Sequence, residues 1–391
     1  MEFCKRLYGS LICRVKRNLH QRCRNSSKAA LAQAGRRDFA RENGLAGAKC
    51  GKNATVQRLH IASNLTNADG LILPSKKEFL PNPAHLEQTI AAPLEFSGVG
   101  LHSGAPVTLR LLPAPAGSGI VFRRTDLDNF EISAIGRNIA KVSYATSLMR
   151  QGVLISTTEH LLSALVGMGV DNVIAELDNL ELPILDGSAL PYVQAFQSVG
   201  IRIQRRRRET VRVLCPVEVR EGDRFIGVYP GSGYSVRYTI DFPAPIGYQT
   251  AYVDLAAETY GKTIAPARTF GYKADEVKLR DMGLIRGASP ECTIVLTPDG
   301  PENGPLRFPD EYVRHKILDL IGDLALAGRR IEGHVVAERA GHAMHTALVS
   351  RLMKDRSAWE LAHVPMEPAP DEENAPPEGN VNVNIPVLVS A

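Results

Sequence analysis

Cysteine is scarce in the body of this 391-residue chain. Four of the six cysteines lie within the first fifty residues, and only Cys215 and Cys292 lie beyond them. Two scattered cysteines do not form a disulfide framework, and the irregular spacing of the first four contains no Cys-x-x-Cys pair. The sequence therefore excludes a small disulfide-stapled domain and a cysteine-based zinc site, and it predicts a reducing compartment.

Long apolar runs are also absent. No stretch of about 18 apolar residues occurs, so we expect no transmembrane helix. The first residues also lack the apolar core of a secretory signal. Residues 1–60 instead hold 14 Lys and Arg against 3 Asp and Glu, a net charge of +11 within a total of +4, which leaves −7 for the remainder.

An arginine-rich, acid-poor start is typical of an organelle transit peptide. We expect a leader over residues 1–85 and a mitochondrial location, with a plastid as the alternative. The competing interpretation is a basic tail that binds RNA or anionic lipid. Because the remainder of the chain is acidic, the run Arg205–Arg208 favours a solvated linker over a nucleic-acid patch, and we expect no nucleic-acid partner. Residues 361–391 are rich in Pro, Glu and Asn and are predicted to be disordered.

Between leader and tail, short strand patterns are interrupted by a few helical patterns. A first set comprises strands at 107–112, 119–124 and 173–177 and helices at 157–165 and 190–197. A second set comprises strands at 211–220, 225–229, 234–242 and 331–338 and helices at about 310–327 and 342–354. The order of elements predicts an α+β protein with two similar domains, 86–207 and 208–360, that face each other. Thr157 or Thr158 is placed to cap the first helix.

His315, Asp319 and Asp323 are spaced four residues apart within a predicted helix. This spacing places the three side chains on one face, and a His and a carboxylate at i and i+4 can reach a single metal ion. By itself, such a pair is more typical of a surface or capping contact. A catalytic zinc takes about three protein ligands and keeps one position open, so a third ligand is needed.

Glu159 and His160 are adjacent at the start of an otherwise apolar helix. A glutamate in a first helical turn is ordinarily explained by the helix dipole, which leaves His160 unexplained. The functional interpretation makes His160 the third metal ligand and Glu159 the general base that takes a proton from the attacking water.

Further candidates lie in glycine- and proline-rich turns. His342 follows Gly341, and His345 lies three residues on. Taken alone, each of these histidines is more typical of the protein surface, but in the context of the other candidates His342 suits a general acid or a cation that stabilises an oxyanion. Thr269 suits an oxyanion donor, and the neighbouring Phe270 and Tyr272 suit an apolar wall or a strand core. His102 lies in a glycine-rich turn that either cradles an anion or closes a tight loop.

Together these segments resemble the zinc-dependent UDP-3-O-acyl-N-acetylglucosamine deacetylases, which perform the committed step of lipid A synthesis. The resemblance covers residues from about 88 to 360. The stretches that carry it are Gly98–Gly104, Ser156–His160, Leu185–Ser188, Ala267–Gly271, Asp310–Asp323 and Gly341–Ala343.

The resemblance implies two domains, each with two helices packed on a sheet, and an active site in the cleft between them. It also implies an insert at about 263–290 that forms a passage for the acyl chain. The implied zinc ligands are His160, His315 and Asp319, and the implied catalytic residues are Glu159, His342, Asp323 as the partner that orients His342, and Thr269. The implied substrate contacts are Lys316 and Phe242 near the sugar and nucleotide, and Leu101, Tyr272 and Ile285 in the passage.

The sequence thus predicts a zinc amidase that acts on a UDP-linked acylated amino sugar, with Fe²⁺ as the alternative metal, and we expect a monomer. A zinc peptidase is disfavoured because no H-E-x-x-H helix occurs. The alternative is a non-catalytic protein that binds a UDP-linked lipid, and the intact set of ligands and base argues against it.

Overall fold

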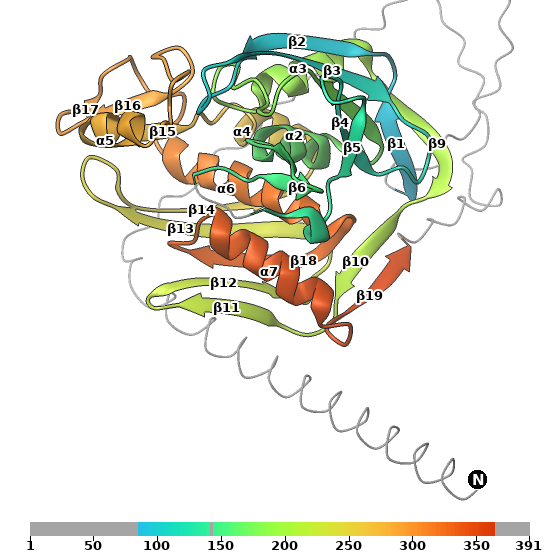
Figure 1. Cartoon of the computed structure of the whole chain (residues 1–391). Helices are drawn as coiled ribbons and strands as arrows, with labels where there is room; N and C mark the ends of the chain where they lie inside the picture. The colour runs from blue at the N-terminus through green and yellow to red at the C-terminus, as the bar shows by residue number, and fades with distance from the viewer. Residues whose placement is uncertain (1–84, 141–143, 364–391) are drawn as a thin grey trace, which may run out of the picture. The chain divides into compact units, whose positions relative to one another are not determined.

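The computed structural model describes residues 85–140 and 144–363, so the predicted leader and tail lie almost entirely outside the described residues (Figure 1). Apart from Leu214–Pro216, the described residues belong to one compact unit, which contains all the predicted site residues.

The first part of this unit is built on a five-stranded sheet. Its strands lie in the order β2 (Leu94–Val99), β3 (Pro106–Pro113), β8 (Val173–Leu177), β4 (Ile120–Arg124) and β5 (Phe130–Ser133). Alternate residues of β3 are buried, as expected for a strand with one face on the core. Two helices accompany this sheet, α2 (Glu159–Met168) and α3 (Leu190–Val199). Tyr192 of α3 packs edge-on against Phe96 of β2, with ring centroids 4.9 Å apart.

The second part is built on a seven-stranded sheet around β18 (Arg330–Glu338), which pairs with β12 (Arg224–Tyr229), β13 (Tyr234–Phe242) and β10 (Glu209–Val213). The outer strands are β11 (Val217–Glu221), β14 (Gly247–Asp254) and β19 (Trp359–His363). Helix α6 (Glu311–Leu324) packs on β13 and β14, and α7 (His342–Lys354) packs on β11 and β12. The predicted α+β class, with two helices for each main sheet, is confirmed.

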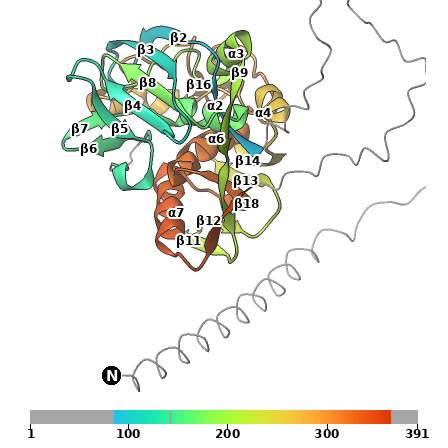
Figure 2. The same ribbon diagram turned by 90° about the vertical axis from the view of Figure 1, so that its right-hand side faces the viewer.

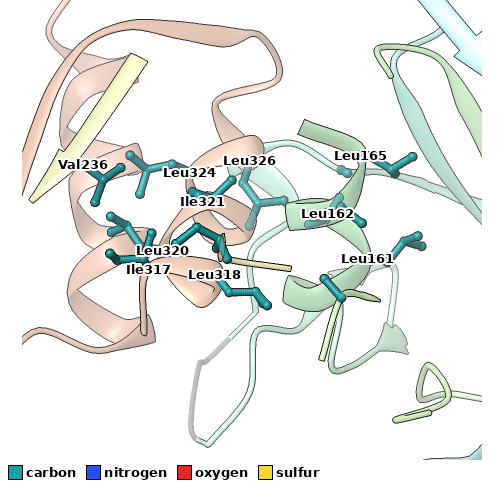
Figure 3. Close-up of a cluster of buried hydrophobic side chains, with 14 of the residues drawn as sticks. Leu161, Leu162, Leu165, Val236, Ile317, Leu318, Leu320, Ile321, Leu324 and Leu326 are labelled. Atoms are coloured by element: carbon teal, nitrogen blue, oxygen red, sulfur yellow. The ribbon is translucent and has the colours of Figure 1, made fainter. Parts of the chain in front are cut away.

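Helices α2 and α6 pack against each other between the two main sheets, as both views show (Figures 1 and 2). Figure 3 shows the apolar side chains at this contact: Leu161, Leu162 and Leu165 of α2, Ile317, Leu318, Leu320, Ile321 and Leu324 of α6, with Val236 and Leu326. Full burial of each such side chain stabilises the fold by about 1.5–3 kcal/mol relative to exposure. Apart from Arg314 and Lys316, every residue of α6 is buried, so its polar residues lie within the protein.

Smaller elements complete the unit. β1 (Leu86–Ile90) pairs with β9 (Ile201–Arg207), and β6 (Leu148–Arg150) pairs with β7 (Val153–Ile155). Helix α4 (Ala257–Thr263) precedes a small sheet of β15 (Phe270–Tyr272), β16 (Ile294–Thr297) and β17 (Gly300–Pro301), with α5 (Glu276–Asp281) between β15 and β16. The predicted insert at about 263–290 contains β15 and α5. Within the described residues, no helix is long and apolar enough to cross a membrane.

Two local predictions were wrong. Arg205–Arg207 do not form a linker but the end of strand β9, and Arg208 is buried on Asp171, with Nη2 2.6 Å from Oδ2. Thr158 occupies the N-cap position of α2, but its hydroxyl makes no capping bond and donates to the carbonyl oxygen of Thr146 at 3.2 Å. In both cases the side chain or strand binds a partner that lies far away in the sequence, which local patterns do not reveal.

Candidate metal and catalytic site

The structure brings the three predicted metal ligands together at the contact of α2 and α6. Nε2 of His315 lies 3.3 Å from Oδ1 of Asp319, and Nε2 of His160 lies 3.7 Å from the same oxygen. The ligand atoms of all three residues lie within 4.8 Å of one another, and all three residues are buried. His315 and Asp319 share one face of α6 as the spacing predicts, and His160 reaches them from α2.

The protonation of the two histidines suits a metal ion. Nδ1 of His315 lies 3.0 Å from the carbonyl oxygen of Ala267, which fixes a proton on Nδ1 and leaves Nε2 free to bind a metal. Burial and the neighbouring His315 lower the pKa of His160 to about 3, so its imidazole is neutral. Two neutral imidazoles and a carboxylate form a donor set that suits Zn²⁺ and also Fe²⁺.

Asp319 is held as an anion. Its Oδ2 accepts a 2.6 Å hydrogen bond from Nζ of Lys316. Burial alone would raise the pKa of Asp319, but His315 and Lys316 lower it below its ordinary value. The ammonium of Lys316 also lies 5.9 Å from the ring centroid of Phe270. Lys316, predicted to contact substrate, therefore lies at the edge of the ligand cluster and already neutralises part of its charge.

Glu159 is the first residue of α2 and is buried beside this cluster. Its Oε2 accepts a 3.0 Å hydrogen bond from the backbone N–H of Thr146, and its Oε1 lies 4.0 Å from Nε2 of His342. Burial raises the pKa of Glu159 to about 8, so its ionised carboxylate is a stronger base than that of an ordinary glutamate. The turn before it is strained, because Thr157 has φ +58°. A 2.8 Å hydrogen bond from the hydroxyl of Thr157 to Glu181 holds this conformation.

His342 begins α7 and faces both Glu159 and the metal ligands. Its Nδ1 lies 2.8 Å from Oδ2 of Asp323, as predicted for an orienting partner. Burial by itself would lower the pKa of His342, but Asp323 and Asp319 raise it to about 9. His342 is therefore an imidazolium with its Nε2 proton directed at the site.

Asp323 has two further partners that sequence analysis did not assign. The hydroxyl of Thr146 donates to Oδ1, and Nδ1 of His345 lies 2.8 Å from Oδ2. His345, which taken alone is more typical of a surface histidine, is completely buried. Its i+3 spacing from His342 was the only available signal, and Thr146 carried none, because its partners lie in distant segments.

Thr269 is held by the loop Leu185–Ser188. Its backbone N–H donates to the carbonyl oxygen of Gly187 at 2.9 Å, and its carbonyl accepts from Ile294 at 2.8 Å. Gly187 has φ +80°, and a Cβ at this position would collide with the carbonyl oxygen of Cys292. Only glycine fits here. Thr269 lies two residues beyond Ala267, whose carbonyl fixes His315.

A cavity of about 320 Å³ opens beside Thr269. Its lining includes the predicted contacts Leu101, His102, Phe270, Tyr272 and Ile285, and also Tyr144 and Leu279. Nε2 of His102 is buried and has no partner. Phe242 is not part of this lining; its ring packs edge-on against Phe270 at 5.7 Å. Phe270 in turn lies 6.2 Å from the ring of His315, which connects the cavity with the ligand cluster.

The fold and site define an α+β protein with a buried His-His-Asp ligand set, an adjacent glutamate and imidazolium, and a neighbouring cavity. Residues 87–354 match the family model of the UDP-3-O-acyl N-acetylglycosamine deacetylases. A UDP-3-O-acyl-N-acetylglucosamine deacetylase of Solibacter usitatus is 54% identical over 276 residues, covering 70% of this chain and 94% of that protein. The protein of the same name from Myxococcus xanthus is 45% identical over 283 residues, covering 70% and 88%.

A third protein of that name, from Anaeromyxobacter dehalogenans, is 42% identical over 285 residues, covering 71% of this chain and 91% of its own. The chain belongs to the UDP-3-O-acyl N-acetylglycosamine deacetylase family.

Proposed function

We propose that this protein hydrolyses the acetamide of UDP-3-O-acyl-N-acetylglucosamine and releases acetate and UDP-3-O-acyl-glucosamine, the committed step of lipid A synthesis. The observation that carries the proposal is the convergence of His160, His315 and Asp319 with Glu159 and His342 in a chain of this family. A protein that only bound the lipid would not need a buried base and a partly buried imidazolium whose Oε1 and Nε2 atoms lie 4.0 Å apart.

His160, His315 and Asp319 would hold the metal ion, which we propose to be Zn²⁺ with Fe²⁺ as the alternative. When bound, the ion supplies Lewis acidity, which acidifies water and polarises a carbonyl group. The lysine on Asp319 and the carbonyl on His315 keep these ligands oriented and in the required protonation state.

The chain's own groups handle the protons and the developing charge. Glu159 accepts a proton from the water that attacks the acetamide carbon. The hydroxyl of Thr269 and the imidazolium of His342 stabilise the negative charge that develops on the carbonyl oxygen. When the C–N bond breaks, the sugar nitrogen takes a proton from Glu159 or His342 and leaves as the amine, while acetate departs.

The 3-O-acyl chain would occupy the cavity lined by Leu101, Tyr272 and Ile285. Burial of its methylene groups contributes about 0.8 kcal/mol per group. Lys316, Phe242, Phe270 and His102 would contact the sugar and the nucleotide side of the substrate. These contacts would place the acetamide between Glu159 and His342, in a cleft between domains 86–207 and 208–360.

The test is acetate release from UDP-3-O-acyl-N-acetylglucosamine by the purified full-length protein. We expect release in the presence of Zn²⁺ or Fe²⁺, loss of release with a chelator and recovery when the metal is restored. Parallel measurement of bound metal identifies the ion. If folded, metal-loaded protein releases no acetate but binds the substrate, the alternative of a UDP-lipid-binding protein replaces the deacetylase.

We also propose that residues 1–85 direct the protein to mitochondria and that the catalytic body is monomeric. Support for targeting comes from the basic, acid-poor composition of a segment that precedes the family match at residue 87. A fusion of residues 1–85 to a fluorescent protein tests the location, and import into plastids would select the alternative. Sedimentation measures the oligomeric state.

A further inference from the structure

The side chain of His345 lies between Asp323 and Tyr238, a residue of strand β13, and contacts both. Its Nδ1 lies 2.8 Å from Oδ2 of Asp323, and its Nε2 lies 3.0 Å from the hydroxyl of Tyr238 on β13. His345 is 0% exposed, and so are Asp323 and Tyr238. The side chains form a continuous row, Tyr238–His345–Asp323–His342, that runs from the second sheet into the site, and its first three members are buried.

The carboxylate of Asp323 fixes the position of one proton on each histidine of this row. Asp323 is an anion, so both imidazoles must present an Nδ1–H to its Oδ2. His342 already supplies the positive charge that this carboxylate pairs with, and burial lowers the pKa of His345. The hydroxyl of Tyr238 donates to the carbonyl oxygen of Ala340 at 2.8 Å, and its oxygen lies 3.0 Å from Nε2 of His345.

We propose that His345 is a positioning residue for the deacetylation: through its Nδ1–H, backed by Tyr238, it holds the Asp323 carboxylate in the orientation in which Oδ2 faces His342. This inference rests on the proposed function. The carboxylate has two rotatable bonds and sits on a helix, so Thr146 on Oδ1 alone does not fix both oxygens. The bond from His345 supplies the second fixed point.

Packing alone does not account for this histidine. An imidazole buried in an apolar core costs free energy unless both nitrogens are bonded, and a leucine of similar volume would carry no such cost. Both nitrogens of His345 do have partners, and one partner is the residue that orients His342. Removal of the ring would leave a buried carboxylate one donor short, beside the imidazolium that it must hold.

The test compares two variants. His345→Leu removes both nitrogens, whereas His345→Asn keeps a donor, because Nδ2 of asparagine lies the same number of bonds from Cα as Nδ1 of histidine. We expect His345→Leu to lower kcat by about 10–100-fold, with KM and bound metal little changed. We expect His345→Asn to stay within about threefold of the wild type, because the donor to Asp323 is kept. His334→Leu is the matched control: His334 bonds Ser235 at 2.8 Å, away from the site, and its loss should leave kcat unchanged.

Two results would overturn the inference. If His345→Leu lowers the melting temperature but keeps kcat, the histidine is only structural. If His345→Asn loses as much kcat as His345→Leu, the Nδ1 donor is not what matters. A readout independent of turnover is the ¹⁵N spectrum of histidine-labelled wild-type protein, where we expect a proton on Nδ1 of His345; protonation at Nε2 alone would also overturn the inference. Absence of acetate release by the wild type would refute the proposed function. The ¹⁵N spectrum would even then show whether His345 donates from Nδ1 to Asp323.

Discussion

Gly322 of α6 lies directly against the backbone of Glu159 of α2, and a Cβ at position 322 would collide with the carbonyl oxygen of Glu159. The two helices that carry the metal ligands can approach only because this residue has no side chain. The contact sets the distance between the proposed base and the ligands on α6. A change in the packing of these two helices would therefore also change the geometry of the site.

Gly322→Ala should therefore affect stability and activity together. The atoms in the way belong to backbone, which cannot move aside, and overpacking of this kind costs about 1–3 kcal/mol. Urea denaturation measures the loss, and acetate release measures the displacement of Glu159. Gly261→Ala in α4 is the matched control, because a Cβ there meets Val193 at an ordinary 3.5 Å. Equal stability of both variants would show that the helices have room to separate.

Mutations should distinguish the metal ligands from the base and the acid by their separate effects on bound metal and on kcat. His315→Ala should lose the metal ion, because one of only three protein ligands is removed. Glu159→Ala and His342→Ala should keep the metal and lose most turnover, by about 10²–10⁴-fold for the base. Metal analysis of each purified variant, together with kcat, makes the distinction. A near-normal rate for Glu159→Ala would mean that another group takes the proton.

Thr269→Val should lower kcat by about 10²–10³-fold with little change in KM, since a donor to the oxyanion acts mainly in the transition state. Valine has the same shape as threonine, so the loop held by Gly187 and Ile294 should keep its structure. Steady-state kinetics provide the measurement. A rise in KM at unchanged kcat would place Thr269 in ground-state binding instead.

The plot of activity against pH should be bell-shaped, with an acid limb set by Glu159 and an alkaline limb set by His342. Burial raises the pKa of Glu159 to about 8, so activity should rise as the base ionises. Despite its burial, His342 has a pKa raised to about 9 by Asp323 and Asp319, so activity should fall as this acid loses its proton. A bound dication favours the deprotonated form of both groups and should move both limbs to lower pH.

Asp323→Asn tests the assignment of the alkaline limb. Asp323 is the strongest of the charges that raise the pKa of His342, so its neutralisation should lower that pKa and move the alkaline limb further down. The acid limb of Glu159 should move down as well but less, because Asp323 is a smaller contributor there. The profile of kcat/KM against pH provides the measurement. An unmoved alkaline limb would assign it to a group other than His342.

Much of the fold was accessible from the sequence because it depends on local periodicity. Helix α7 begins and ends where its pattern predicts, and β3 alternates between core and solvent as its residues require. Helical spacing alone places His315 and Asp319 on one face, whatever surrounds the helix. The family resemblance added the roles expected of Lys316 and Phe242, which local pattern could not supply.

Tertiary structure decided whatever depends on segments that are far apart in the chain. Arg205–Arg207 end strand β9, which pairs with β1 and places Arg207 opposite Leu86, and the hydroxyl of Thr158 bonds a carbonyl on another segment instead of its own helix.

The sequence by itself determined the types of ligand and their spacing along α6, because a helix repeats at fixed intervals. Only packing decided that α2 brings His160 and Glu159 to them, that Thr146 joins Glu159 to Asp323, and that His345 is buried rather than exposed. These contacts depend on the close approach of two helices at Gly322, which no local pattern encodes.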